Sequence, residues 1–503
     1  MDQIINHVAN RRPSSSWSLV IYGARGRTCL TLAELDRLAR KTALHLERLG
    51  VSAGDRIGII AKNCLEWVLL DLAAIKIRAV TAGFEAGKFA PTAELAERYG
   101  LRLIFSDQTG DGVRVLPIAE LLAAIEDIAH DPDLDPVAYA PGDVTTIKFT
   151  SGSTGQPKGL AATVGSIDSS ISAVQSLFSH AADDTLFIFL PLSLLQQRYW
   201  IYSALVYGHG VVLSTYERAF HAMKQEAPTV VMGVPAFFEA LRKDILSRVR
   251  NNDPDGLRAA AEEALGTRCR YLWTGSAPAA PEMLRFFERC GIAIFEGYGM
   301  NETCIVTKNA PGANRLGSVG RPLPGKRVSI DDDGVVIVSS DFPVNREYLF
   351  CSPGESELIF RPDGSVRTGD LGRIDADGFL YILGRADDIV VLENGRNILV
   401  RPIEEKLRAC SAIENCIVTG FGRSHLVAII CAAPGSGARE QIERYIADLN
   451  EATRPDERIG TFMLTEEPFS IENGLLTSQY KPKRKAILER YGRDVAQASR
   501  GMA

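Results

Sequence analysis

Long apolar runs are missing from this chain of 503 residues. No stretch approaches the roughly 18 apolar residues that a membrane span requires, and the apolar run over residues 229–238 is too short. The first residues, MDQIINHVANRR, lack the apolar core of a secretory signal. We therefore expect no membrane span and no secretory leader.

Paired cysteines and clustered histidines are also missing. The nine cysteines are scattered without a CxxC pair, and the seven histidines form no HxxxH or HxH pattern. This spacing argues against a disulfide framework, a structural zinc site and a histidine-built metal site. It is typical of a protein of the reducing cytosol, so we expect a cytoplasmic location.

A basic excess is missing too, because the chain has 56 Lys and Arg residues and 62 Asp and Glu residues, which gives a net charge of −6. We therefore expect no nucleic-acid partner. Apolar residues make up 46% and charged residues 23%, which is ordinary for a globular protein. At roughly 100–200 residues per domain, the length predicts more than one domain.

The pattern along the chain predicts an α/β fold with layered βαβ sheets. A capping box at Thr31 and Glu34 begins a helix, and short apolar strands at 55–60, 103–105, 185–190, 210–213 and 229–232 alternate with helical stretches. From residue 317 onward, dense Gly, Pro and Asp predict a β-rich subdomain. After residue 384, two helices and two strands predict a small α+β unit. We expect a large N-terminal domain with several subdomains over residues 1–386 and a C-terminal domain over residues 387–503.

The most informative stretch is a loop rich in Gly, Ser and Thr that follows an apolar segment over residues 144–149. Its backbone can approach a polyanion closely, and its hydroxyl and N–H groups can donate to phosphate oxygens. It is not a Walker loop, because Pro157 stands where that pattern requires Gly. A flexible surface turn is the alternative. The predicted phosphate-binding residues are Thr150, Ser151, Gly152, Ser153, Thr154, Gly155 and Lys158.

Further motifs follow in order along the chain. An aromatic between two glycines suits a flat base, a carboxylate a few residues later suits a hard cation, and an Asp can accept from both hydroxyls of a diol. Taken singly, these motifs could be ordinary turns, a Gly-rich bend or a solvated surface lysine. The motifs are Gly275-Ser276-Ala277-Pro278, Glu296-Gly297-Tyr298-Gly299-Met300-Asn301-Glu302, Thr368-Gly369-Asp370, Gly384-Arg385-Ala386-Asp387-Asp388 and the run 472–484, which contains Lys481.

Together these runs resemble the adenylate-forming superfamily, which includes acyl-CoA synthetases, luciferases and the adenylation domains of peptide synthetases. The terminal run, ENGLLTSQYKPKR, is similar to that of long-chain acyl-CoA synthetases. The resemblance implies ATP and Mg²⁺ as cofactors. It assigns the 150–158 loop to the β- and γ-phosphates, residues 275–278 and 296–300 to the adenine side and Asp370 to the ribose. It assigns Arg385 to ribose or phosphate, Glu302 to Mg²⁺, Asn301 to the α-phosphate, Asp387 to the hinge and Lys481 to catalysis.

The resemblance also implies a reaction in two steps. An acid is activated as an acyl-adenylate with release of pyrophosphate, and the acyl group is then transferred to a thiol, for which we expect CoA. A carrier protein or an amine is the alternative acceptor, and an unusual small anion is an alternative acid. The C-terminal domain is expected to be mobile, so that Lys481 can approach the phosphates. A non-catalytic nucleotide sensor is the other class of function, and the retained Lys158, Glu302, Asp370, Arg385 and Lys481 argue against it.

The chain departs from the family pattern where the acid is expected to bind. The long-chain type usually reads PLxHxxER, whereas residues 191–198 read PLSLLQQR. Leu194 replaces a His or aromatic residue, and Gln197 replaces an acidic residue. Arg198 matches a structural arginine of the family and could instead serve a polar acid. Asn301 replaces a Thr but can still donate a hydrogen bond. The predicted substrate pocket is Leu194, Gln197 and Arg198, with the identity of the acid left open.

Overall fold

The computed structural model contains two compact units. The large unit comprises residues 1–275, 281–329 and 337–367, and the small unit comprises residues 276–280, 330–336 and 368–503. Each unit is described by itself below. The structure describes residues 3–13, 17–24, 26–110, 112, 114–128, 131–150, 157–249, 253–393, 396–420, 425–433, 438–476 and 482–498.

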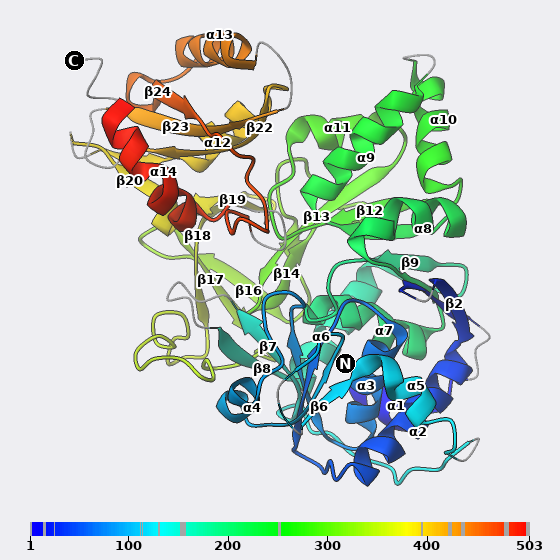
Figure 1. Cartoon of the computed structure of the whole chain (residues 1–503). Coiled ribbons are helices and arrows are strands. Elements are labelled where there is room, and N and C mark those ends of the chain that lie inside the picture. The colour runs from blue at the N-terminus through cyan, green and yellow to red at the C-terminus, as the bar shows by residue number, and fades with distance from the viewer. Residues whose placement is uncertain are drawn as a thin grey trace. The chain divides into compact units, whose positions relative to one another are not determined.

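The larger sheet of the large unit is parallel in its interior and antiparallel at both edges (Figure 1). Its interior strands are almost wholly buried, as expected for parallel strands covered on both faces. In spatial order its described strands are β15 (Arg321–Pro322), β14 (Cys304–Lys308), β13 (Ala293–Met300), β12 (Tyr271–Thr274), β11 (Val230–Gly233), β9 (Thr185–Ile188), β10 (Gly210–Leu213), β1 (Ser18–Gly23) and β2 (Gly26–Thr31).

A second sheet has five parallel strands among its described residues and an antiparallel edge strand, β8, which forms a hairpin with β7. The hairpin carries the predicted phosphate loop between its strands. In spatial order the strands are β6 (Val115–Pro117), β5 (Leu101–Ser106), β3 (Arg56–Ile60), β4 (Val80–Phe84), β7 (Val144–Thr150) and β8 (Lys158–Thr163).

One hydrophobic core joins the two sheets of the large unit through the helices between them. It contains Ile57 of the smaller sheet, Leu213 of the larger sheet, and Leu69 and Trp200 from helices. Helix α3 is buried around its whole circumference, which is the pattern of an interior helix. The described helices of this unit are α1 (Ile4–Asn10), α2 (Leu32–Arg48), α3 (Leu65–Lys76), α4 (Ala93–Tyr99), α5 (Leu121–Ala124), α6 (Val164–Phe178), α7 (Leu195–Tyr207), α8 (Ala219–Glu226), α9 (Pro235–Arg248), α10 (Pro254–Leu265) and α11 (Pro281–Arg289), with 3₁₀ turns at Ile118–Glu120 and Tyr216–Arg218.

The β-rich stretch predicted after residue 317 forms a four-stranded sheet whose described strands follow the chain order, with its last two strands antiparallel. Its strands are β16 (Lys326–Ile330), β17 (Val335–Ser340), β18 (Val366–Ile374) and β19 (Leu380–Arg385).

Thr31 caps α2 by accepting from the Glu34 N–H, and the Glu34 side chain accepts from the Thr31 N–H, as the capping box predicts.

The C-terminal part of the small unit packs helices on both faces of a three-stranded sheet. Because strand side chains alternate, Cys416 and Val418 of β22 face the core that contains Leu407 of α12, whereas Ile417 faces the core that contains Ile487 of α14. The described elements are the 3₁₀ turn η3 (Ala386–Asp388), β20 (Ile389–Val391), β21 (Asn397–Leu399), α12 (Arg401–Arg408), β22 (Ile413–Thr419), β23 (Leu426–Ala432), α13 (Ala438–Glu451), the 3₁₀ turn η4 (Pro455–Glu457), β24 (Ile459–Leu464) and α14 (Arg484–Ala498).

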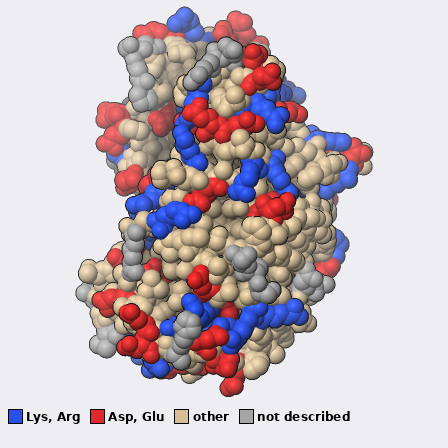
Figure 2. All heavy atoms as spheres, turned by 90° about the vertical axis from the view of Figure 1, so that its right-hand side faces the viewer, with Lys and Arg blue, Asp and Glu red and all other residues tan. Residues whose placement is uncertain are grey.

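Two surface properties bear on partners. On the face drawn in Figure 2, the described Lys and Arg side chains lie among Asp and Glu side chains rather than in one continuous basic patch. Among the described residues, no helix combines the length and the apolar character needed to cross a bilayer.

Candidate nucleotide and acid site

The predicted adenine motif lies at the end of a strand rather than in a Gly-rich bend. Strand β13 runs through it to Met300, and its last four residues pair antiparallel with β14, with a register shift after Tyr298. A Cβ on Gly299 would lie 1.9 Å from the Cys304 carbonyl oxygen. Only glycine therefore permits the two strands to approach this closely.

The predicted magnesium ligand, Glu302, lies in the tight turn between β13 and β14. The Met300 N–H donates to the Thr303 hydroxyl at 3.1 Å, and the Thr303 N–H donates to the Met300 carbonyl at 3.2 Å. Asn301 is half-buried in the same turn. Glu302 is buried, and its carboxylate accepts a hydrogen bond of 2.6 Å from the Tyr348 hydroxyl.

Lys158, the predicted phosphate lysine, contacts the same tyrosine. It begins β8 and pairs in register with Thr150, so the two ends of the predicted phosphate loop lie side by side. Its ammonium nitrogen lies 5.0 Å from the centre of the Tyr348 ring and forms a 3.1 Å ion pair with Glu355. The Ser352 N–H and Lys158 hold the pKa of Glu355 below its usual value. Residues 151–156 of the loop lie outside the described residues.

Tyr348 thus brings together Lys158 and Glu302, which are far apart in the sequence. Tyr348 and Glu355 were not predicted, because they lie in a turn-rich stretch without a motif. Among the described residues, no three His, Cys, Asp or Glu side chains gather in a way that could hold a metal. A single carboxylate suits Mg²⁺ that is bound mainly through substrate phosphates and water. Glu302 therefore suits Mg²⁺ only when a bound polyphosphate supplies further oxygen ligands.

The motif over residues 275–278 follows β12, which is the parallel neighbour of β13. A Cβ on Gly275 would lie 3.3 Å from the Gly297 carbonyl oxygen, so the two glycine-bearing strand ends lie close together. Ser276 has a φ of +67°, a left-handed conformation that is uncommon for residues other than glycine. Ser276 and Pro278 are exposed, and Ala277 is half-buried.

In the small unit, the predicted ribose residues face each other across β18 and β19. Asp370 and Arg385 are paired in register, and Arg385 Nη1 lies 3.3 Å from Asp370 Oδ1. Arg385 also donates to the Thr368 carbonyl at 3.2 Å. Asp370 is buried, and the Thr368 hydroxyl accepts from its N–H at 3.1 Å. The carboxylate and the guanidinium are therefore held as a pair.

The predicted hinge residue and the predicted catalytic lysine follow this pair in the sequence. Asp387 lies in the 3₁₀ turn η3, and the neighbouring Asp388 pairs with Arg484 at 2.9 Å. Arg484 also donates to Glu404 at 2.5 Å and to the Val418 carbonyl at 2.7 Å, which anchors the end of the terminal motif in the small unit. Lys481 lies outside the described residues.

The predicted acid pocket lies at the start of α7, where Leu194 precedes the first helical residue. Arg198 is 1% exposed and pairs with Asp71 at 2.7 Å. Its Nη1 also donates to the hydroxyls of Thr81 and Thr146. Gln197 is buried, and its side-chain oxygen has no hydrogen-bond partner within the described part of the chain. Gln197 therefore offers an unpaired amide oxygen. Arg198 is paired through Nη1, whereas its Nε and Nη2 have no hydrogen-bond partner within the described part of the chain.

Comparisons with known proteins identify the family. A family model described as AMP-binding enzyme matches residues 5–339, and one described as AMP-binding enzyme C-terminal domain matches residues 387–501. The long-chain-fatty-acid–CoA ligase FadD15 of Mycobacterium tuberculosis is 26% identical over 93% of this chain and 92% of its own length. The 2-succinylbenzoate–CoA ligase of Bacillus subtilis is 27% identical over 91% of this chain and 94% of its own length.

Solved structures share the fold. The o-succinylbenzoate CoA synthetase of Bacillus subtilis in complex with the acyl-adenylate OSB-AMP has a TM-score of 0.79 at 22% identity, covering 96% of this chain and 97% of that one. ATP-bound MatB from Rhodopseudomonas palustris has the same TM-score at 21% identity, covering 98% and 99%. These structural matches confirm the predicted α/β fold class, and the family models and curated relatives confirm the resemblance to acyl-CoA synthetases. The chain belongs to the AMP-binding enzyme family, the adenylate-forming superfamily that its motifs predict.

Proposed function

We propose that this chain is an AMP-forming acid–thiol ligase that uses ATP. In the first step a carboxylate oxygen of the acid attacks the α-phosphorus of ATP, and the bond to pyrophosphate breaks. In the second step a thiol sulfur attacks the acyl carbon, and AMP leaves. The observation that carries the proposal is the meeting of Lys158 and Glu302 at Tyr348. This meeting places a cation and a buried carboxylate at one point beside the ends of the phosphate loop.

Each group of predicted residues would bind a different part of ATP. Lys158 would hold the phosphates together with the 150–155 loop, and Tyr298 would cover the adenine beside the glycines of β13. Asp370 and Arg385 would bind the ribose. Glu302, oriented by Tyr348, would hold Mg²⁺, which neutralises phosphate charge when it is bound. The catalysis supplied by these residues is positioning and charge stabilisation.

Lys481 has a separate role in the proposal. A carboxylate and an α-phosphate oxygen about 4 Å apart repel by roughly 4 kcal/mol at an effective dielectric constant of about 20. An ammonium group that contacts both would convert this repulsion into attraction. We propose that the C-terminal domain beyond residue 387 turns about Asp387 to deliver Lys481, and then turns again to admit the thiol.

The acid is proposed to bind beside α7 without a direct contact to Arg198. Asp71 already neutralises the charge of that guanidinium through Nη1. A second carboxylate could reach only its unpartnered Nε and Nη2 atoms and would add a second buried negative charge. Leu194 and Gln197 remain as the pocket residues, so the pocket would combine an apolar wall with one amide. This composition suits an uncharged acyl group that carries a hydrogen-bonding substituent.

CoA is the acceptor that the relatives favour, because the curated relatives reported above are named as CoA ligases. A carrier protein or an amine is the alternative acceptor, and the experiment below separates them. The nine cysteines are all free, which supports the proposal that the protein works in the reducing cytosol.

Exchange of labelled pyrophosphate into ATP tests the proposal directly. The panel should include aliphatic, aryl, amino and hydroxy acids, each with and without CoA. We expect at least one acid to support exchange, and CoA to convert that acid into a thioester with release of AMP. Exchange without thioester formation would favour a carrier protein or an amine as acceptor. No exchange with any acid would contradict the ligase proposal.

A further inference from the structure

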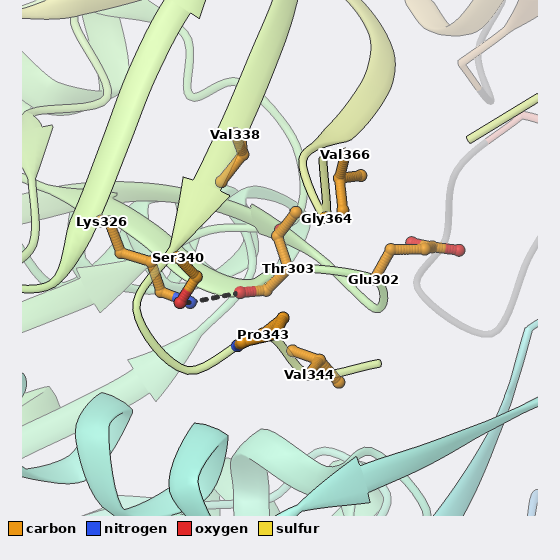
Figure 3. A pocket seen from close by; sticks show the side chains of 9 residues that line it. All are labelled: Glu302, Thr303, Lys326, Val338, Ser340, Pro343, Val344, Gly364 and Val366. Carbon is orange, nitrogen blue, oxygen red and sulfur yellow. Dashed lines mark hydrogen bonds between the residues drawn. The ribbon is translucent and has the colours of Figure 1, made fainter. Parts of the chain in front are cut away.

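Two buried lysines donate to main-chain carbonyls at the two ends of residues 296–302, which we call the nucleotide segment. Lys308 of β14 donates to the Phe295 carbonyl at 2.7 Å, immediately before the segment. Lys326 of β16 donates to the Thr303 carbonyl at 3.1 Å, immediately after it, as the dashed line in Figure 3 marks. The segment is therefore held at both ends by lysine side-chain nitrogens.

Each lysine also fixes a second element. Lys308 Nζ lies 3.4 Å from the Thr274 carbonyl oxygen, so it links the end of β12 to Phe295 of the neighbouring parallel strand β13 (Figure 1). Lys326 Nζ lies 3.0 Å from the Ser340 hydroxyl oxygen, at the end of β17. Lys326, Ser340, Thr303 and Glu302 line one pocket (Figure 3).

A general contribution to stability does not account for these lysines. Lys308 is 2% exposed and Lys326 is 7% exposed, and neither forms an ion pair within the described part of the chain. Burial lowers the pKa of both side chains, although the charge of Glu296 raises the pKa of Lys308 and that of Asp341 raises the pKa of Lys326. An apolar side chain of similar size would avoid the cost of burying an ammonium group. An apolar side chain could not replace their hydrogen bonds to the two flanking carbonyls. It could also not replace the contact of Lys308 Nζ with the Trp273 ring, whose centre lies 3.4 Å away.

The glycine at position 297 fits the same arrangement. A Cβ there would lie 2.8 Å from Lys308 Cδ and 3.2 Å from its Nζ. The Lys308 side chain therefore packs directly against the backbone of the nucleotide segment, and the missing side chain of Gly297 leaves room for it.

We propose that Lys308 and Lys326 are positioning residues that fix the backbone of the nucleotide segment, Lys308 at its adenine end and Lys326 at its Glu302 end. This inference rests on the proposed function, because it takes the segment as part of the ATP site. Neither lysine contacts the reacting atoms in this proposal. Each acts through the carbonyl that it holds.

Nucleotide affinity measured by calorimetry separates the two roles and does not require the acid to be known. Lys308→Met should weaken the binding of AMP and of Mg-ATP alike, by about tenfold. Lys326→Met should weaken Mg-ATP by about tenfold and change AMP affinity less than twofold, because AMP does not require Glu302. Unchanged affinity for both ligands in both variants would overturn the inference. Absence of nucleotide binding in the wild type would instead contradict the proposed function.

Lys76 provides a matched control, because it is also a buried lysine that donates to main-chain carbonyls. It bonds the carbonyls of Val8 and Ala9 at 3.0 and 3.3 Å and pairs with Asp36. Lys76→Met should lower the free energy of unfolding and leave nucleotide affinity unchanged. An equal loss of affinity in Lys76→Met, Lys308→Met and Lys326→Met would show a general structural effect and overturn the positioning role.

A conservative variant covers the case in which Lys308→Met does not fold. Lys308→Gln keeps an N–H donor and should bind AMP more weakly than the wild type, by a factor between two and ten. Hydrogen exchange of the amides over residues 295–303 should be faster in Lys308→Gln and Lys326→Met and unchanged in Lys76→Met. Wild-type exchange rates over this segment in both variants would contradict the inference.

Discussion

At the scale of single residues, Tyr348 contacts both Lys158, the proposed phosphate ligand, and Glu302, the proposed magnesium ligand. Its hydroxyl donates to Glu302 at 2.6 Å, and its ring lies beside the Lys158 ammonium group. A hydrogen bond to a charged group contributes about 1.5–3 kcal/mol. Tyr348→Phe removes this hydrogen bond and keeps the ring.

We predict that Tyr348→Phe raises the magnesium concentration for half-maximal pyrophosphate exchange by about tenfold, because Glu302 loses the group that orients it. Titration of the exchange rate with MgCl₂ at saturating acid measures this shift. Glu302→Gln should have a larger effect in the same assay. An unchanged magnesium requirement in Tyr348→Phe would contradict the proposed role of the tyrosine.

Arg198 illustrates a residue whose motif allowed two roles. Its ion pair with Asp71 is buried, and removing one partner of such a pair costs about 3–5 kcal/mol because the other charge is left uncompensated. We predict that Arg198→Met lowers the free energy of unfolding by this amount, and that Asp71→Asn in the same chain restores part of it. Chemical denaturation of the single and double variants measures the coupling. A stable Arg198→Met protein with a raised KM for the acid would instead assign Arg198 to the substrate.

At the scale of elements, β13 and β14 form the hairpin that carries the nucleotide segment. Its geometry depends on Gly299, whose absent side chain lets the Cys304 carbonyl approach. We predict that Gly299→Ala destabilises the large unit by roughly 2–4 kcal/mol and abolishes detectable nucleotide binding. Thermal unfolding and calorimetry measure the two effects.

Gly142→Ala is the matched control, because nothing lies within 4 Å of the added Cβ. It should bind nucleotide with wild-type affinity. Normal nucleotide binding by Gly299→Ala would show that the hairpin is not part of the site.

The sequence predicts the elements better than their contacts. The helix capped by Thr31 and the strands near residues 55, 210 and 229 follow from local periodicity, and the structure confirms them. The 296–300 motif is different, because its glycines also suit a bend, and only pairing with β14 makes it a strand. Tyr348, Lys308 and Lys326 have no local signature, since their roles depend on carbonyls and carboxylates that are distant in the sequence.

The roles assigned to residues 151–155 and to Lys481 rest on motif resemblance, because these residues lie outside the described part of the chain. The order of the motifs along the chain predicts the family, and the family models confirm it. The composition of the acid pocket does not follow from the motif, because the PLSLLQQR run is compatible both with a different substrate and with a structural role of Arg198. The Arg198–Asp71 ion pair was not predictable from spacing.

At the scale of the whole molecule, two buried histidines make stability depend on pH. Burial lowers the pKa of His180 to about 3 and of His209 to about 4. The unfolded chain takes up these protons first, near the ordinary histidine pKa of about 6.5. The contribution of each histidine to stability is therefore complete above that pH and is lost as the pH falls towards 4, by about 2 kcal/mol per histidine at pH 5.

We predict that the free energy of unfolding falls between pH 6.5 and pH 4.5, and that His209→Asn makes this dependence less steep. His221→Asn is the control, because His221 is exposed, and it should keep the wild-type slope. Urea titrations across this pH range measure the slopes. Equal slopes of the unfolding free energy against pH in all three proteins would show that His209 does not contribute to this pH dependence.

The central claim about the whole molecule is that Lys481 of the C-terminal domain acts only in the first half-reaction. The most direct measurement compares both half-reactions in Lys481→Ala, with the acid identified by pyrophosphate exchange. We predict that this variant forms no detectable acyl-adenylate, yet converts a supplied acyl-adenylate and CoA into the thioester at a rate within about threefold of the wild type. Equal loss of both half-reactions, or retained adenylate formation, would contradict the account.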